Sequence, residues 1–256
     1  MGTVQPFRYR GYVYDVETGL YYLRSRYYNP ERSRFINADA RIKGNLFSYC
    51  ENRPCIRTDP SGLSSEWWFV ITHLREAYEI GLYVEGRRCK NITTTAVRIS
   101  VNLGLSNSSS MAGEGTQVNA VRHALWTAII KSKFGTDIAK EAIESHEDYD
   151  ALRGYKRIKD SSEKQLNRNT FADRLYGDGI CDMLNNNIAL NMSVDGMSAK
   201  EICREVLNTY HTTGLWVLKP NDTKYPYSLC KEILDDDSYN TAIDYLNKMD
   251  DYGFFD

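Results

Sequence analysis

Apolar positions recur at helical spacing over most of the chain after residue 64. Ser64 and Ser65 can cap a first helix, whose apolar residues follow at this spacing from Trp67 to Leu82. A second, stronger pattern begins near Thr116, where apolar residues gather on one side of the predicted helix. The helices predicted after Leu82 lie at about 116–134, 136–146, 170–188, 198–215 and 228–249.

At the beginning of the chain, short runs of residues alternate with a period of two instead. The runs 12–15 and 20–23 are short, rich in Tyr and Val, and separated by turn residues, which is typical of β-hairpin strands. A weaker β signal covers 92–101. The fold class expected from these patterns is mainly α. A small β-rich segment, 1–63, precedes a helical domain, 64–256.

Charge is divided unevenly between these two parts. The whole chain has a net charge of −2. Residues 1–63 contain 10 Lys and Arg against 6 Asp and Glu, so the remaining 22 and 28 give residues 64–256 a net charge of −6. Domains that grip nucleic acid are usually basic, so this acidity weakens a nuclease interpretation without excluding it. The basic stretch 153–159 is either a solvated surface or a local phosphate-binding face.

Cysteine usage and hydropathy exclude several classes. The six cysteines form no Cys-x-x-Cys pair, which argues against zinc-ribbon and thioredoxin chemistry, and free, buried thiols are expected. The longest apolar runs, near 67–71 and 124–130, are too short to span a bilayer. The N-terminus lacks the apolar core of a signal peptide, so no such peptide is expected.

The first 63 residues contain a series of specific short motifs. They are Tyr12-Val-Tyr-Asp15, Thr18-Gly-Leu-Tyr-Tyr-Leu23, Arg26-Tyr-Tyr28, Arg34-Phe-Ile-Asn-Ala-Asp39 and Asp59-Pro-Ser-Gly-Leu63. With these motifs the segment resembles the closing part of the RHS/YD-repeat shell, the RHS-associated core, of bacterial polymorphic toxins. The resemblance implies that the rest of the shell lies upstream and that 64–256 is a variable toxic tip. It also implies secretion, delivery into a target cell, and a cognate immunity protein as partner.

The same resemblance implies self-cleavage. RHS cores are similar to aspartyl proteases that cut after the terminal Asp-Pro-x-Gly-Leu, and the matching carboxylates here are Asp39 and Asp59. Two carboxylates that share a proton can activate water, one as base and one as acid. The expected scissile bond is Leu63–Ser64. The chain departs from the family at Ala40, where Pro is usual, and its spacer to Asp59 is short.

Three predicted helices carry polar residues that could converge. Residues four apart on a helix share a face, as Asn119 and His123 do. If the apolar faces of these helices pack together, His123, His146 and Asp182 can meet. The candidate catalytic residues are Arg122, His123, His146, Glu147, Asp182 and Asn186. The candidate substrate-binding residues are Asn119, Trp126 and Asn185.

These residue types suit two kinds of chemistry. Imidazoles and carboxylates support general acid–base hydrolysis, with Arg122 stabilising developing negative charge. A divalent metal, zinc or calcium, held by His123, His146 and Asp182 is the alternative, with Glu147 as base for a bound water. A phospholipase A2-like histidine would be followed by Asp, but Ala124 follows His123.

Structural roles compete with each of these assignments. Arg122 could form an ion pair with Glu144 or Asp182, and 185–187 could mark the end of a helix. His73 and His211 lack polar clusters of this kind, and we interpret them as structural.

The order Arg-His-x-x-Trp, His-Glu and Asp-x-x-Asn-Asn resembles a helical domain found at the ends of bacterial secreted and polymorphic toxins. We therefore expect a toxin domain, and favour a hydrolase acting on nucleic acid or on phospholipid and cell-envelope substrates. The alternative is a non-catalytic toxin that perforates membranes or binds a protein, neutralised by an immunity protein.

Overall fold

The computed structural model describes residues 12–23, 26–36, 69–70, 72–81, 89–105, 115–147, 149–221 and 224–255, without the side chains of 149 and 150. The chain divides into two compact units, Met1–Thr72 and His73–Asp256. Asp39, Asp59 and Leu63, and with them the predicted cleavage point and domain boundary, lie outside the described residues.

The first unit contains a small antiparallel sheet whose strands are joined in sequence order. The predicted hairpin is present, with Tyr14 opposite Tyr21. One face buries Leu23 and Phe35, and the guanidinium of Arg26 lies 3.7 Å from the centre of the Phe35 ring. The strands are β1 (Val13–Asp15), β2 (Leu20–Tyr22), β3 (Tyr27–Asn29) and β4 (Arg34–Phe35).

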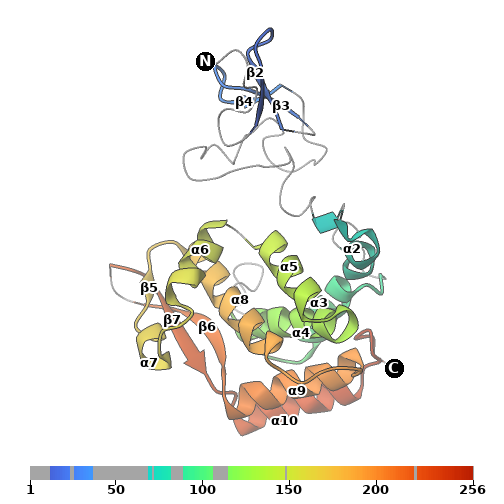
Figure 1. Ribbon diagram of the computed structural model, residues 1–256. Coiled ribbons are helices and arrows are strands. Elements are labelled where there is room, and N and C mark those ends of the chain that lie inside the picture. The colour runs from blue at the N-terminus through green and yellow to red at the C-terminus, as the bar shows by residue number, and fades with distance from the viewer. Residues whose placement is uncertain are drawn as a thin grey trace. The chain divides into compact units, whose positions relative to one another are not determined.

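The second unit is mainly helical, as expected (Figure 1). Its described helices are α2 (Leu74–Ile80), α3 (Ile92–Asn102), α4 (Gln117–Phe134), α5 (Thr136–His146), α6 (Tyr149–Ile158), α7 (Glu163–Leu166), α8 (Arg174–Leu190), α9 (Ala199–Thr212) and α10 (Asp236–Asn247). None of the described helices combines the length and the apolar composition that crossing a bilayer requires.

Helix α4 is the centre of this unit. Thr116 caps it by accepting a hydrogen bond from the Asn119 amide, and the chain leaves it at Gly135, whose φ is 87°. The predicted helix at 116–134 is thereby confirmed. Helices α3, α5, α8 and α9 all pack against α4. A helix enclosed in this way needs apolar residues on several sides, which Val121, Leu125 and the other buried residues of α4 supply.

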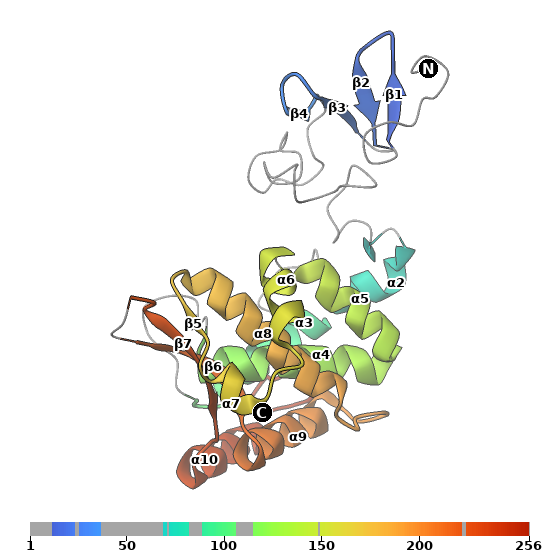
Figure 2. The same ribbon diagram turned by 60° about the vertical axis from the view of Figure 1, so that its left-hand side comes forward.

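Figure 2 shows α9 and α10 side by side along one edge of the unit, with the sheet next to α8. Helix α8 therefore lies between α4, α6 and strand β6.

A three-stranded antiparallel sheet, which the hydrophobic pattern did not predict, accompanies the helices. It contains β5 (Thr170–Phe171), β6 (Leu215–Pro220) and β7 (Tyr227–Glu232), in the order β5-β7-β6.

The prediction of one helix over 228–249 was wrong, because its first part is β7. Strand β7 pairs with β6 through Val217 and Cys230, and α10 begins only after the Asp235 cap. The helix predicted to reach 215 ends at Thr212, because Gly214, with a φ of 85°, turns the chain into β6.

Other boundaries also differ from the predictions. The weak β signal at 92–101 belongs to helix α3, which the Asn91 side chain caps. The triplet 185–187 is not a helix end, because α8 continues to Leu190. The basic stretch 153–159 is largely helical, in α6. Among the described cysteines, Cys181 and Cys203 are free and buried, while Cys89 and Cys230 are free and partly exposed.

Candidate functional site

Three helices bring their polar residues together. Helix α4 supplies Asn119, Arg122 and His123, and the end of α5 supplies His146 and Glu147. Helix α8 contributes a buried polar row with a spacing of four residues: Asp178, Asp182 and Asn186. Because residues four apart share a helix face, this row is aligned along the side that faces α4.

The ring of His123 lies between two carboxylates. Its Nε2 is 3.3 Å from Asp182 Oδ2, and its Nδ1 is 3.7 Å from Glu147 Oε1. The exposed fractions of the three side chains are 14% for His123, 8% for Asp182 and 7% for Glu147. The cluster is therefore almost dry but still reached by solvent at the imidazole.

Asn119 holds two of the buried carboxylates together. Its amide nitrogen donates to Asp178 Oδ1 at 3.0 Å and to Asp182 Oδ1 at 2.8 Å. Arg122 donates to the Asn119 side-chain oxygen, which brings a positive charge to the edge of the cluster. Asp178 was missed as a site residue, although its position four residues before Asp182 was a visible signal.

The pKa values of the two facing groups are shifted in opposite directions. Burial, together with the neighbouring charges of Asp178 and Glu147, raises the pKa of Asp182 well above its ordinary value. Burial and then the positive charge of Arg122 lower the pKa of His123 well below its ordinary value. Both shifts favour a proton on Asp182 over one on His123, and the two groups titrate as a pair.

A second chain of hydrogen bonds orients Glu147. Asn186 donates from its amide nitrogen to Glu147 Oε1 at 3.2 Å, and Thr127 donates to the Asn186 oxygen at 2.9 Å. Asn186 is buried, so both halves of its carboxamide are engaged within the protein. Glu147 is thereby held beside His123 by a donor from α8.

His146 and Trp126 form the outer edge of the cluster. Their ring centres are 5.5 Å apart, and the Trp126 indole donates to Thr93 at 3.1 Å. Trp126 is buried whereas His146 is exposed, so the second imidazole reaches the surface above a packed indole.

Asn185 faces away from this cluster. It is fully buried, donates to the Trp216 carbonyl at 2.9 Å, and accepts from the Trp216 amide at 2.8 Å. These bonds fasten β6 to α8, so we leave Asn185 out of the site. Of the two ion pairs considered for Arg122, the one with Glu144 is not formed, because Glu144 pairs with Lys156 at 3.2 Å.

The other two histidines, His211 and His73, have their contacts outside this cluster. His211 stacks on Tyr239 with ring centres 4.5 Å apart, and its Nδ1 lies 2.8 Å from the Leu234 carbonyl oxygen. His73 precedes α2, with its Nδ1 3.8 Å from Glu141.

The residues proposed as metal ligands do not form a ligand set. Within the described ranges, no three or more His, Cys, Asp or Glu side chains are placed to hold a metal ion. His123 is surrounded by carboxylates, but His146 packs on Trp126. We therefore assign no step to a metal.

Comparison with known proteins gives a family and several partial relatives. A family model described as "Domain of unknown function (DUF6973)" matches residues 85–213. The tRNA(Glu)-specific nuclease WapA of Bacillus subtilis subsp. natto is 35% identical over 99 residues, which is 35% of this chain and 4% of that protein. Toxin protein Tse5 of Pseudomonas aeruginosa is 44% identical over 62 residues, 23% of this chain and 5% of that protein.

A further relative is the putative uncharacterized protein YlbH of Escherichia coli, 46% identical over 63 residues, 23% of this chain and 26% of that protein. This chain thus spans a small part of the length of each relative. No solved structure matches it.

Proposed function

Since this chain belongs to the family described as a domain of unknown function (DUF6973), we propose that its helical unit is a toxin domain that hydrolyses its substrate by acid–base catalysis. The partial relatives, one named as a tRNA nuclease and one as a toxin, support the first half of this proposal. The cluster around His123 supports the second half.

The relatives also support the proposed arrangement along the chain. A nuclease and a differently named toxin each share a stretch amounting to 35% or 23% of this chain, and 5% or less of their own length. A short segment shared by differently named proteins fits a common delivery part. The 62 residues matched by Tse5 are about as long as the RHS-like segment 1–63, and we assign them to it, whereas the 99-residue WapA match is longer than this segment. In this proposal the toxic tip begins at Ser64, is delivered into a target cell, and is neutralised by an immunity protein.

The observation that carries the catalytic proposal is the carboxylate at each nitrogen of one largely enclosed imidazole. The ring of His211, by contrast, has a single carboxylate, Asp236 at its Nε2, and a backbone carbonyl at its Nδ1. Two carboxylates at one ring, with Asp178 behind them, oppose one another electrostatically. Burial and these neighbouring charges raise the pKa of Asp182, while burial and the charge of Arg122 lower the pKa of His123. Such costly clusters of ionisable groups are found preferentially at functional sites.

These groups can supply both halves of a hydrolysis. Glu147, supported by His123, removes a proton from water, and the water oxygen bonds to the electrophilic centre of the substrate. The bond to the leaving group then breaks, and a proton held at rest on Asp182 returns to the leaving group through His123 or the exposed His146. Arg122 balances the negative charge that develops.

Toxicity of the full chain tests this proposal. Inducible expression in bacteria is expected to arrest growth, and His123→Gln is expected to restore it, because glutamine cannot carry a proton between the carboxylates. His211→Gln is the matched control, since it also replaces a partly buried histidine with a carboxylate 3.4 Å away. Arrest that persists at an equal level of folded His123→Gln protein would overturn the catalytic role.

A further inference from the structure

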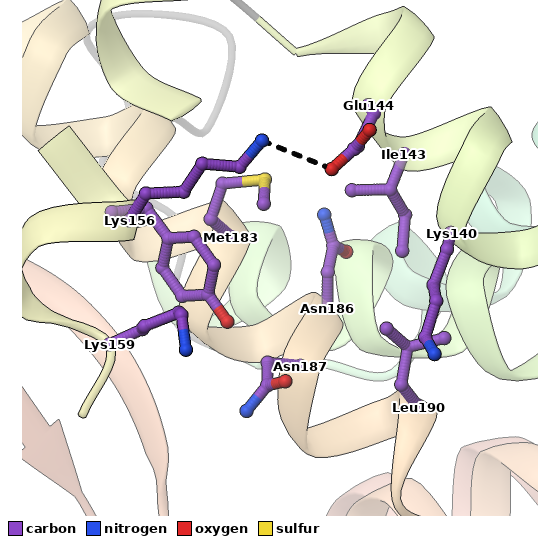
Figure 3. A pocket seen from close by; sticks show the side chains of 10 residues that line it. Lys140, Ile143, Glu144, Lys156, Lys159, Met183, Asn186, Asn187 and Leu190 are labelled. Carbon is purple, nitrogen blue, oxygen red and sulfur yellow. Dashed lines mark ion pairs between the residues drawn. The ribbon is translucent and has the colours of Figure 1, made fainter. Parts of the chain in front are cut away.

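A pocket with lysines among its lining residues opens beside the cluster. Its cavity volume is about 290 Å³, and its lining comes from α5, α6 and α8 together with Lys159, which follows α6. In Figure 3, Lys156 and Lys159 lie on one side of the pocket and Lys140 on the other, with Asn186 and Asn187 between them.

The pocket is positive although the domain is acidic. Three lysines and one glutamate line it, a net charge of +2, whereas residues 64–256 have a net charge of −6. Glu144 pairs with Lys156, and Lys159 pairs with the exposed Asp160 at 2.8 Å. Within the part of the chain that the structure describes, Lys140 has no ion-pair partner. An anion entering here meets one unpaired ammonium and two others held by weak, exposed pairs.

Asn186 connects the pocket to the acid–base cluster. This residue lines the pocket and donates to Glu147, which faces His123. Met183, another lining residue, directly follows Asp182 in the chain. A group bound in the pocket would therefore lie next to the carboxylate that we propose as the base.

We propose that this pocket binds a phosphate of single-stranded nucleic acid and thereby presents a neighbouring phosphodiester to the cluster. The inference rests on the proposed function, and names its substrate class. Ammonium groups from opposite sides suit a phosphate, and the exposed carboxamide of Asn187 can read a base edge.

Phospholipid is the competing ligand, and the lining disfavours it. The aliphatic, thioether and aromatic side chains of the pocket are Ile143, Met183, Leu190 and Tyr155. Acyl chains need a longer apolar channel than these four can make. A splayed nucleotide needs only the small, mixed surface that the pocket offers.

The net negative charge of the domain limits how many phosphates of a strand it is expected to contact. Two or three phosphate contacts at the lysines give a slope of about −1.4 to −2.1 in a plot of the logarithm of the binding constant against the logarithm of the salt concentration, for a single strand. Repulsion from the rest of the domain limits binding beyond the pocket. We expect recognition of a short loop or end rather than tracking along a long strand.

Binding is measured with the full chain carrying Asp182→Asn, which prevents turnover. The probes are fluorescent single-stranded RNA and DNA oligonucleotides, and vesicles of phosphatidylglycerol and phosphatidylcholine. Lys140→Ala and Lys156→Ala are expected to weaken oligonucleotide binding about tenfold each, as loss of a charge-assisted hydrogen bond does. Each should also reduce the salt slope by about 0.7.

Two further variants sharpen the test. Glu144→Gln removes the competing carboxylate, so it is expected to tighten oligonucleotide binding severalfold, opposite in sign to the lysine variants. Lys164→Ala, an exposed lysine on α7, makes the same charge change elsewhere and should leave binding unchanged. Thermal unfolding of each variant establishes that it is folded.

Lysine-dependent binding of vesicles without binding of oligonucleotides would overturn the proposal in favour of phospholipid. Oligonucleotide binding that is equally weakened by Lys164→Ala, or by none of the lysine variants, would also overturn it. Because these readouts need no turnover, they are independent of toxicity. If His123→Gln stays toxic while Lys140→Ala weakens oligonucleotide binding, the catalytic proposal fails and the binding site stands.

Discussion

The proton held by Asp182 links the chemistry of the site to the stability of the fold. Because the folded state raises the pKa of this carboxyl, it binds a proton that the unfolded chain releases above about pH 4. Stability from this group is therefore complete at lower pH and declines as the pH rises toward the folded pKa. His123 acts in the opposite sense, because its lowered pKa weakens the fold as the pH falls below about 6.5.

Asp182→Asn is expected to remove the loss of stability at high pH. Asparagine resembles the protonated acid and can still accept from Asn119. The melting temperature of the variant minus that of the wild type should therefore be larger at pH 8 than at pH 5. Asp235→Asn is the control, because hydrogen bonds from Ser238 lower the pKa of this exposed cap. A melting temperature lowered equally at both pH values would mean that Asp182 is needed as a structural anion.

Asn185 has a different role, and its replacement should affect stability. Asn185→Ala leaves the buried amide of Trp216 without its side-chain partner, and leaves the Trp216 carbonyl with the Cys181 thiol as its remaining side-chain donor. We expect a loss of about 3 kcal/mol in the free energy of unfolding, measured by urea denaturation. Asn187→Ala, two residues further along α8 and exposed, should change it by less than about 0.5 kcal/mol. Equal effects of the two changes would contradict the anchoring role.

At the level of single residues, helical spacing predicted part of the cluster around His123. The pairing of Asn119 with His123 on one face, and the meeting of His123 with Asp182, follow from spacing and packing. The separation of Asn185 from Asn186 does not, although the two are adjacent. Consecutive helix residues point about 100° apart, so only the position of β6 decides that one residue enters the core and the other the site.

At the level of elements, the long helices were the most predictable. Helices α4, α5 and α9 begin within about two residues of the predicted starts, where side chains suited to capping stand in α4 and α9. Strands β6 and β7 were not predicted, because a strand buried against α8 has a short apolar run that a helix could equally contain. Long-range pairing distinguishes the two, and local sequence cannot.

The contact between α6 and α8 depends on small residues. A Cβ added at Gly179 would lie 2.6 Å from the Ala151 Cβ. Gly179→Ala should therefore destabilise the protein by about 1 kcal/mol, although alanine favours helix, because two rigid backbones must separate. Thermal or urea unfolding measures this. Adding Ala151→Gly should recover part of the loss, and strictly additive effects of the two changes would show that the helices do not touch here.

At the level of the whole molecule, the boundary between the two compact units falls between Thr72 and His73. A delivery part that ends at Leu63, followed by a toxic tip, is our proposal. If Asp39 and Asp59 cut the chain as proposed, the purified protein should give two masses, one ending at Leu63 and one beginning at Ser64. Asp39→Asn and Asp59→Asn should each leave a single full-length mass. A single full-length species from the unaltered chain would contradict cleavage. Asp15→Asn is the control, because Asp15 lies in the N-terminal sheet, where it accepts from Thr18, and this variant should be cleaved like the unaltered chain.

The sequence alone determined the helical character of the second unit, the hairpin of the first and the residue types of the site, because these depend on local spacing. Tertiary structure decided which polar residues share one space. Asp178 lies beside Asp182, and Asn185 bonds to β6. His146 packs on Trp126 and does not complete a metal site with His123 and Asp182. It also placed three lysines around one pocket of an acidic domain. Such groupings arise from helices distant in sequence, whose relative positions depend on the packing of the whole core.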